Sequence, residues 1–437
     1  MKYDKTIYAL SESVDKEKFV ICTYYCEAAT SDLLLKAGSM AVEQTTGTWV
    51  PVPLETPQVR QRHVGRLIGV YEIPHYEFAL PAGVKERRFV FRLAFPIINM
   101  GEQIPELLAT VSGNIMNGGK LKLLDIEFPE SFAKKFKGPK FGVEGVREIL
   151  GVKDRPMTLG MIKPCTGCTP EQCGEVVYEL GMGGVDIVKD DELLADTEYC
   201  TCKDRFTEVM KAVKRVKEET GKTVLYAMNI TDRPDRMLEK ALWAVRNGAN
   251  ALMINIQAAG YGAFQMISEH PEINVPMLAH PAFSGVLYES EYSGLASHLV
   301  IGKLSRMAGA DIVVYPCAYG KLKLLREAYI RIAQTLQAPF YHIKPSLPSP
   351  AAGVHPGLLP TMADDIGTDF LIGAGGAMHG HPMGPAAGVI ALTVAGDAIA
   401  RGIDLLEAAK TSKELEEAIR TWGMVVDENN TLYELER

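Results

Sequence analysis

The sequence lacks a long apolar run, a block of like charges and a start typical of an exported protein. No apolar run approaches the roughly 18 residues of a membrane helix, so we expect no membrane span. Residues 1–20 lack the basic start and apolar stretch of a secretory signal, which leads us to expect a cytoplasmic protein. The net charge is −8 without a cluster of basic residues, so we expect no nucleic-acid partner.

The cysteines form no complete zinc or disulfide signature. Cys165 and Cys168 make a CxxC pair, and Cys200 and Cys202 make a CxC pair. No Cys or His quartet with finger or ribbon spacing completes either pair, and reduced thiols are usual in a chain without an export signal. We interpret these cysteines as small, partly buried residues, and the role of the CxxC pair stays open.

The chain is rich in alternating structural signals from about residue 150 onward. Short apolar, β-branched runs alternate with longer amphipathic stretches, several of which end in glycine, as repeated βα units do. The predicted strands cover residues 158–163, 184–189, 223–229, 250–255, 276–280, 310–315, about 340–344 and 369–372. Eight parallel strands with intervening helices in about 250 residues predict a (β/α)₈ (TIM) barrel.

The first part of the chain has a different pattern. Its predicted strands cover residues 19–26, 64–73, 87–96 and 121–129, with a helix at 31–44 between the first two. This mixture predicts an N-terminal α+β (ferredoxin-like) domain over residues 1–130. The barrel domain with C-terminal helices then covers residues 131–437 and begins with a linker rich in glycine and lysine.

Polar residues stand at the predicted C-terminal ends of the barrel strands, where enzymes of this fold build their sites. The first strand ends at Lys163, the fifth ends at His280, and the second runs into the sequence KDDE at 189–192. An isolated KDDE is typical of a solvated face, but the apolar GVDIV before it favours a buried strand that opens into a cavity. Clustered carboxylates supply the hard oxygen ligands that suit Mg²⁺.

Glycines follow the last two predicted strands. Gly375 and Gly376 belong to GAGG after the eighth strand, and Gly353 follows the seventh. Loops at these two places in a barrel commonly bind phosphate through backbone N–H groups, so a phosphate site is plausible, although glycine at a tight turn explains the same pattern. His379 and His381 in HGHPMG are ambiguous, and we assign them no role.

Several motifs in the same order resemble the large subunit of RuBisCO and the RuBisCO-like proteins over nearly the whole chain. They are VEQTTGTW at 42–49, IKP at 162–164, GGVDIVKDDE at 183–192 and GAGGAMHGHPMG at 373–384. The resemblance implies that Lys189 takes up CO₂ as a carbamate and holds Mg²⁺ together with Asp191 and Glu192. It also implies that Lys163 is the general base and that His280 binds substrate.

The same resemblance implies a shared active site. Gly353, Gly375 and Gly376 would hold a substrate phosphate. The N-terminal domain of a neighbouring subunit would contribute Glu43, Thr48, Trp49 and Asn114. We therefore expect a homodimer or a higher homo-oligomer that binds a phosphorylated small molecule.

Departures from the carboxylase pattern narrow the activity. Cys165 stands where the carboxylases have a second catalytic lysine, and Pro281 and Val314 replace an arginine and a histidine that would bind a second phosphate. We infer a monophosphate substrate and no CO₂ fixation. Lys321 in YGKL is either a mobile-loop lysine of the site or a surface lysine.

Three functions remain open. AHPAFSG at 279–285, ADIVVYPCAYG at 310–320 and AAGVHPG at 351–357 look most like the methionine-salvage enolases, which act on 2,3-diketo-5-methylthiopentyl-1-phosphate. However, those enolases carry a catalytic lysine where this chain has Asn114, so a lyase that decarboxylates a phosphorylated 3-oxo sugar acid, of the 3-oxo-isoapionate-4-phosphate type, is the alternative. A non-catalytic or redox-responsive protein is the least favoured of the three.

Overall fold

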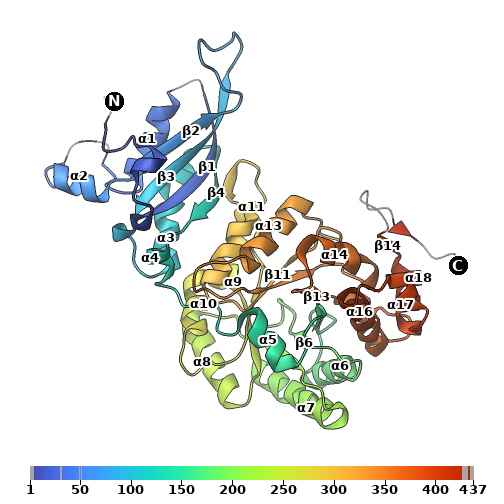
Figure 1. Ribbon diagram of the computed structural model, residues 1–437. Helices are drawn as coiled ribbons and strands as arrows, with labels where there is room; N and C mark the ends of the chain where they lie inside the picture. The colour runs from blue at the N-terminus through green and yellow to red at the C-terminus, as the bar shows by residue number, and fades with distance from the viewer. Residues whose placement is uncertain (1–3, 30–31, 49, 51, 426–431, 434–437) are drawn as a thin grey trace. The chain divides into compact units, whose positions relative to one another are not determined.

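The computed structural model describes residues 4–29, 32–48, 50, 52–425 and 432–433. The chain divides into two compact units (Figure 1). The N-terminal unit contains residues 1–137 together with 284–300, and the barrel unit contains residues 138–283 and 301–437. The domain boundary after residue 130 remains a prediction about how the chain folds.

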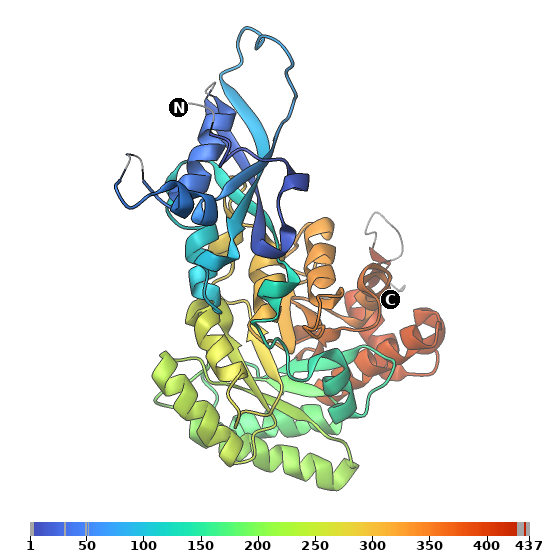
Figure 2. The ribbon, with the colours of Figure 1, turned by 60° about the vertical axis from the view of Figure 1, so that its left-hand side comes forward.

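The N-terminal unit is built on a five-stranded sheet with the order β10-β4-β1-β3-β2. Without the parallel edge strand β10, this is the antiparallel ferredoxin-like arrangement, which confirms the predicted fold class. Figure 2 shows the connection between β2 and β3 reaching beyond the sheet. The elements are β1 Phe19–Ala29, α1 Leu33–Glu43, α2 Pro57–His63, β2 Arg66–Glu72, β3 Glu86–Pro96, α3 Ile104–Val111, β4 Leu121–Glu127, α4 Glu130–Ala133, α11 Gly285–Tyr288 and β10 Ser293–Leu295.

β1 is the central strand of this sheet because it pairs with β3 on one side and with β4 on the other. Cys22, Tyr24 and Cys26 are buried on one face, as the two-residue period of a strand requires. Tyr24 stacks on Phe91 of β3, with 5.1 Å between the ring centroids. This packing fixes the register of β1 against β3.

The barrel unit contains eight parallel strands in the order β12-β11-β9-β8-β7-β6-β5-β13, surrounded by helices (Figure 1). This confirms the predicted barrel. The strands are β5 Met157–Met161, β6 Ile187–Lys189, β7 Leu225–Asn229, β8 Ala251–Asn255, β9 Met277–His280, β11 Ile312–Pro316, β12 Leu347–Ala351 and β13 Leu371–Gly373.

Helices connect the barrel strands, and further helices follow the last strand along the chain. They are α5 Gly142–Leu150, α6 Pro170–Met182, α7 Cys202–Thr220, α8 Pro234–Arg246, α9 Ile256–Ala259, α10 Tyr261–Ser268, α12 Leu304–Met307, α13 Arg326–Gln337, α14 Leu359–Ile366, α15 Gly376–His379, α16 Pro385–Ala400, α17 Leu405–Ala409 and α18 Lys413–Trp422. A short β14 Met424–Val425 pairs with β15 Leu432–Tyr433. No helix in the described ranges is long and apolar enough to cross a membrane.

The predicted seventh strand was wrong. Residues 340–344 form only an isolated bridge, and the seventh barrel strand is β12, with the sequence LPSPA. Prolines at 348 and 350 hid it, because proline cannot donate a backbone hydrogen bond and is rare inside sheets.

Those prolines occupy one edge of β12. Leu347 N–H donates to the carbonyl oxygen of Asp311, so the backbone N–H and C=O groups of the odd-numbered residues of β12 point toward β11. The backbone of the two prolines therefore points toward β13, on the side where no ladder hydrogen bond is needed. The backbones of β12 and β13 come close instead: a Cβ on Gly373 would lie 2.7 Å from the oxygen of Pro350. The barrel therefore closes by tight packing at this seam.

Every second residue of each barrel strand faces the interior. The buried interior cluster includes Leu159, Met161, Ile187, Leu225, Ala227, Ala251, Met253, Leu278, Ile312, Val314, Leu347, Ala351 and Leu371. Continuing this two-residue period toward the C-terminal ends of the strands brings Lys163, Lys189, Asp191, Asn229, Asn255 and His280 to the same inner side. The fold thus places a polar layer on top of an apolar core.

At the opposite ends of the strands, polar side chains tie neighbouring strands together. Asp186, just before β6, accepts from the N–H of Thr158 in β5 at 2.7 Å. Asn250, before β8, accepts from Tyr226 N–H in β7 at 2.8 Å, and Asp311, before β11, accepts from Met277 N–H in β9 at 2.9 Å. These bonds fix the start of alternate strand pairs.

Candidate active site

Lys163 lies at the C-terminal end of β5, against the glycine loop that follows β13. Its Nζ donates to Asp191 Oδ2 at 2.7 Å and to Cys165 Sγ at 2.9 Å. Burial lowers the pKa of Lys163, but the hydrogen bonds that the lysine donates to Asp191 and Cys165 outweigh this effect, and the pKa is raised overall. A Cβ on Gly375 would lie 3.3 Å from Lys163 Cε, so glycine leaves room for this lysine.

The KDDE sequence sends its side chains in alternating directions. Lys189 is 1% exposed, and its Nζ donates to Glu192 Oε2 at 3.1 Å and to the Asp190 carbonyl at 2.9 Å. Asp191 faces the same inner side and pairs with Lys163. The structure therefore brings two lysines and two carboxylates together at the end of β6, as expected from the sequence.

Asp190 points away from this cluster and has a structural role. It forms a bidentate pair with Arg205, both side chains being fully buried, with Nε and Nη2 each 3.0 Å from a carboxylate oxygen. Tyr226 Oη and the N–H of Asn229 donate to the same carboxylate, at 2.6 and 2.8 Å. These hydrogen bonds to Asp190 fix the backbone that positions Lys189 and Asp191.

His280 completes the cluster from the end of β9. Its Nδ1 accepts from the N–H of Ala282 at 3.2 Å, which leaves the proton of the neutral ring on Nε2, 3.3 Å from Glu192 Oε2. Burial, and then the charge of Lys189, lowers the pKa of His280 well below its usual value. Burial raises the pKa of Glu192, but the charge of Lys189 contributes to an opposing effect that outweighs it, and the pKa is lowered overall. His280 is therefore a neutral hydrogen-bond donor.

Two asparagines belong to the same layer and were missed in the sequence. Asn229 Nδ2 donates to the carbonyl oxygens of Asp191 at 3.2 Å and Glu192 at 3.4 Å, and Asn255 Nδ2 donates to the Glu192 carbonyl at 3.0 Å. Both end a barrel strand in phase with its inward-facing residues. The two-residue period of the inward-facing strand positions was the signal in the sequence that could have identified both asparagines.

The glycines expected to bind phosphate differ in how closely they are packed. Gly353 has φ +96°, and a Cβ there would lie 2.7 Å from the backbone nitrogen of Lys321. Lys321 N–H donates to the Ala352 carbonyl at 2.7 Å, which holds the loop after β11 against the loop after β12. Gly376 opens α15 and has open space where a Cβ would be. The backbone of Lys321 thus adjoins the Gly353 turn, and the role of its side chain stays open.

The expected N-terminal residues are partly brought together within their own unit. Asn114 Nδ2 donates to Glu43 Oε1 at 3.3 Å. Thr48 Oγ1 donates instead to Glu55 Oε2 at 3.0 Å. Trp49 lies outside the described residues. The contribution of this group to a neighbouring subunit's site remains a prediction.

The ambiguous histidines have structural partners. His379 Nε2 lies 2.7 Å from the Met161 carbonyl, and His381 Nε2 lies 2.9 Å from the Glu414 carbonyl. The eight cysteines are free thiols, and burial raises the pKa of Cys168 and of Cys173. The two histidine contacts tie α15 to β5 and the loop after α15 to α18.

The donor set fits a hard divalent cation only if Lys189 contributes an oxygen group. No group of three or more His, Cys, Asp or Glu residues that could hold a metal occurs in the described part of the chain. Asp191 and Glu192 supply two carboxylates, and a carbamate on the buried Lys189 would supply the third anionic ligand. Each carboxylate now neutralises a lysine, and a divalent cation could replace those two positive charges.

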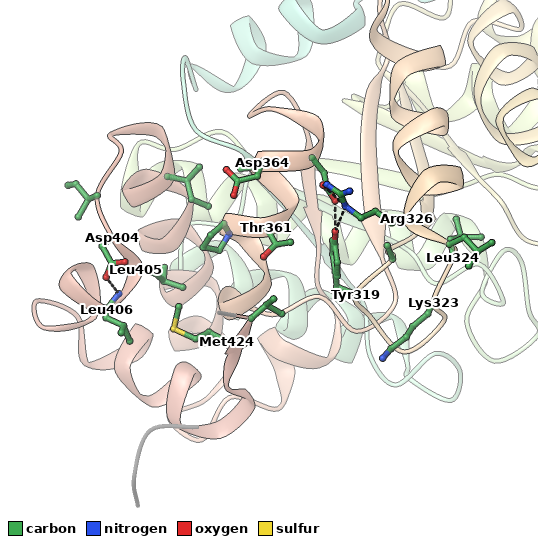
Figure 3. A pocket seen from close by; sticks show the side chains of 18 residues that line it. Tyr319, Lys323, Leu324, Arg326, Thr361, Asp364, Asp404, Leu405, Leu406 and Met424 are labelled. Carbon is green, nitrogen blue, oxygen red and sulfur yellow. Dashed lines mark hydrogen bonds and ion pairs between the residues drawn. The ribbon is translucent and has the colours of Figure 1, made fainter. Parts of the chain in front are cut away.

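A separate cavity of about 1330 Å³ lies on the flank of the barrel unit (Figure 3). Its lining comes from the loop after β11, from α14 and from the C-terminal helices, and it includes none of the predicted site residues. Tyr319 and Arg326 at its edge both bond to Asp365. We assign it no role in the chemistry at the strand ends.

Fold and site together define an enzyme class: a (β/α)₈ barrel with lysines and carboxylates at its C-terminal face and an added N-terminal α+β unit. The family models agree. "Ribulose bisphosphate carboxylase large chain, catalytic domain" matches residues 142–422, and the corresponding "N-terminal domain" matches residues 8–132. The chain belongs to the RuBisCO large-chain family and is an enzyme of that family.

Relatives of the RuBisCO-like kind align with nearly the whole chain. A "ribulose bisphosphate carboxylase-like protein" of Archaeoglobus fulgidus is 45% identical over 94% of this chain and 94% of the relative. A 2,3-diketo-5-methylthiopentyl-1-phosphate enolase of Geobacillus kaustophilus is 39% identical over 93% of this chain and 98% of the relative. The crystal structure of a rubisco-like protein (MtnW) from Alicyclobacillus acidocaldarius has a TM-score of 0.86 and 37% identity, covering 93% of this chain and all of that one. The expected membership of the RuBisCO-like, methionine-salvage type is thereby confirmed.

Proposed function

We propose that this protein is a magnesium-dependent enolase or isomerase that forms an enediolate from a phosphorylated ketose. The observation that carries the proposal is the pairing of Lys163 with Asp191 and of Lys189 with Glu192 at the ends of the neighbouring strands β5 and β6. The preferred substrate is 2,3-diketo-5-methylthiopentyl-1-phosphate, because the enolase relatives that act on it align over 93% of this chain. Carboxylation of a bisphosphate is disfavoured by Pro281 and Val314, which offer no cation to a second phosphate.

Lys189 as its carbamate, Asp191 and Glu192 would hold the magnesium. When bound there, the ion supplies Lewis-acid polarisation of a substrate carbonyl. CO₂ is needed to form the carbamate on Lys189, whose side chain is buried at the end of β6. Asp190, locked to Arg205, keeps this part of the backbone in place.

Lys163 is positioned to remove the carbon-bound proton. Its amine lies 2.7 Å from Asp191 and beside the Gly375 turn, so a substrate bound through its phosphate to that turn presents its carbons near Nζ. The neutral His280, whose Nε2 faces Glu192, would orient a substrate oxygen. Backbone N–H groups of Gly353, Gly375 and Gly376 are the phosphate donors in this scheme.

The N-terminal residues complete the proposal. Glu43 and Asn114 are already hydrogen-bonded to each other, and with Thr48 they would reach the site of a neighbouring subunit in a homodimer or larger assembly. Sedimentation or light scattering tests this arrangement directly. A monomer that is fully active would contradict it.

Asn114 favours one alternative. It stands where the enolases carry a lysine, so a reaction that starts without proton removal suits this chain as well. Decarboxylation of a phosphorylated 3-oxo sugar acid would use the same metal-stabilised enediolate. The two reactions differ in their products, since decarboxylation releases CO₂ and enolisation exchanges a substrate proton with D₂O.

The deciding experiment measures enol formation by ultraviolet absorbance. The protein is incubated with Mg²⁺ and bicarbonate, and 2,3-diketo-5-methylthiopentyl-1-phosphate is added. We expect turnover that requires both additions, is lost in Lys189→Ala and persists in the surface control Lys211→Ala, whose lysine is 65% exposed. If the wild type is inactive, the substrate assignment fails, and CO₂ release from the 3-oxo acid is measured next.

A further inference from the structure

Asn255 lies at the C-terminal end of β8 and faces the barrel interior. Ala251 and Met253 of the same strand belong to the interior cluster, and the two-residue period carries this direction on to Asn255. The residue is 8% exposed and pairs in register with His280 of β9. It is therefore a buried polar group beside the cluster of lysines and carboxylates.

The amide of Asn255 is held in one orientation. Its backbone N–H donates to Thr231 Oγ1 at 2.9 Å, and its Nδ2 donates to the Glu192 carbonyl at 3.0 Å. A flipped amide would turn Oδ1 toward that carbonyl, and two acceptors would face each other. The orientation with Nδ2 toward Glu192 is thus the one that the surroundings allow.

This orientation leaves Asn255 Oδ1 without a donor. The oxygen is closed to solvent and has no hydrogen-bond partner. A buried acceptor without a partner costs about 1–3 kcal/mol, so such a group calls for an explanation. Neighbouring N–H donors are already engaged: Asn229 Nδ2 bonds the carbonyls of Asp191 and Glu192, and His280 Nε2 faces the Glu192 carboxylate.

We propose that Asn255 is a positioning residue of the metal site and that its Oδ1 accepts a hydrogen bond from a water molecule bound to the magnesium. The donor has to be small, because the oxygen is enclosed, and it has to lie near Glu192, to which the amide is tied. A metal-bound water meets both conditions and is a strong donor, since the cation polarises its O–H bonds. The inference rests on the metal site of the proposed function, but not on the identity of the substrate.

The test uses Mn²⁺ as a probe and measures its dissociation constant by electron paramagnetic resonance in the presence of bicarbonate. Removal of an outer partner of a metal site typically weakens metal binding about 10- to 100-fold, and we expect a loss of this size in Asn255→Ala and Asn255→Leu. Asn255→Asp retains an acceptor oxygen and should bind Mn²⁺ nearly as the wild type does. Circular dichroism identifies any variant that does not fold, and Asn255→Ser replaces such a variant.

Asn250 provides a matched control at the other end of β8. Its Oδ1 accepts from Tyr226 N–H at 2.8 Å and its Nδ2 donates to the Val224 carbonyl at 2.9 Å, so both polar atoms have partners. Asn250→Ala should lower the melting temperature without changing Mn²⁺ affinity. An equal loss of Mn²⁺ affinity in Asn250→Ala and Asn255→Ala, each relative to the wild type, would overturn the inference.

The outcomes separate this inference from the function that it deepens. If Lys189→Ala loses Mn²⁺ binding while Asn255→Ala and Asn255→Leu keep the wild-type affinity, the metal site stands and the role of Asn255 is refuted. If Lys189→Ala binds Mn²⁺ as the wild type does, the metal site fails and Asn255 loses its role with it. An inactive wild type that still shows the Asn255 effect refutes only the substrate.

Discussion

The two ends of the barrel both bury charged and polar groups, but they treat them differently. At the N-terminal ends of the strands, Asp186 and Asp311 accept hydrogen bonds from backbone N–H groups of the fold itself. At the C-terminal ends, Lys163 and Lys189 pair with carboxylates that can exchange partners, and Asn255 keeps an acceptor without a donor. Groups with fixed partners stabilise the barrel, and groups with replaceable partners make it reactive.

The largest effect that would test this contrast is the loss of Lys163. Lys163→Met should lower kcat/KM about 10²- to 10⁴-fold, the usual contribution of a general base. Lys140 is the control from the other end, where its Nζ bonds the carbonyls of His270 and Ile273. Lys140→Met should lower the melting temperature and leave kcat/KM nearly unchanged. Equal losses of activity in the two variants would contradict the contrast between the two ends of the barrel.

Adjacent aspartates should separate stability from activity. Asp190→Ala leaves the buried Arg205 without its partner and should lower the free energy of unfolding by about 3–5 kcal/mol. Asp191→Ala should abolish metal-dependent activity at a much smaller cost in stability. Urea denaturation of both variants measures the difference, and a more stable Asp190→Ala than Asp191→Ala contradicts the structural role of Asp190.

Asp311 offers a smaller effect at the N-terminal end. Its carboxylate accepts from the N–H groups of Phe141, Gly142 and Met277. Asp311→Asn turns an amide NH₂ toward some of these donors and should cost about 1–3 kcal/mol of unfolding free energy. Activity per folded molecule should not change, and a changed KM would place Asp311 in the chemistry of the site.

The smallest expected effect concerns Lys240, a charged residue near the C-terminal ends of the strands whose role is structural. Lys240 bonds Asp232 at 2.7 Å and Asp196 at 2.8 Å, and its hydrogen bond lowers the pKa of Asp232 below the usual 3.8. This stabilisation is present above pH 3.8 and is lost as the pH falls through the lowered pKa, because the protonated carboxyl no longer attracts the lysine.

Lys240→Met should therefore destabilise the protein by about 1 kcal/mol near pH 7. Its melting temperature should approach that of the wild type as the pH falls toward 3. A constant difference between the two proteins over this range would show that Lys240 acts through packing and not through charge.

The strand-end residues Lys163, Lys189 and His280 could be predicted because each follows an apolar run that marks a buried strand. The family resemblance singled out Asp191 for the metal, but the pairing of Asp190 with Arg205 was not predicted, because it joins residues 15 positions apart through the fold. Asn255 escaped notice because a single asparagine after ALMI gives no pattern of its own. The strand β12 was misplaced because its prolines contradict strand propensity, and only the closure of the barrel at Gly373 explains why they are tolerated there.

The short strand β10 makes the N-terminal unit discontinuous along the chain. Ser293–Leu295 pair with Leu121–Leu123 at the edge of the sheet, although about half of the barrel strands lie between them in the sequence. A ribosome has therefore to synthesise more than 150 further residues before this edge can be covered, and until then β4 presents open backbone groups to other chains. A fragment that stops at residue 137 should accordingly aggregate, and fusing residues 284–300 to it through a flexible linker should restore its solubility.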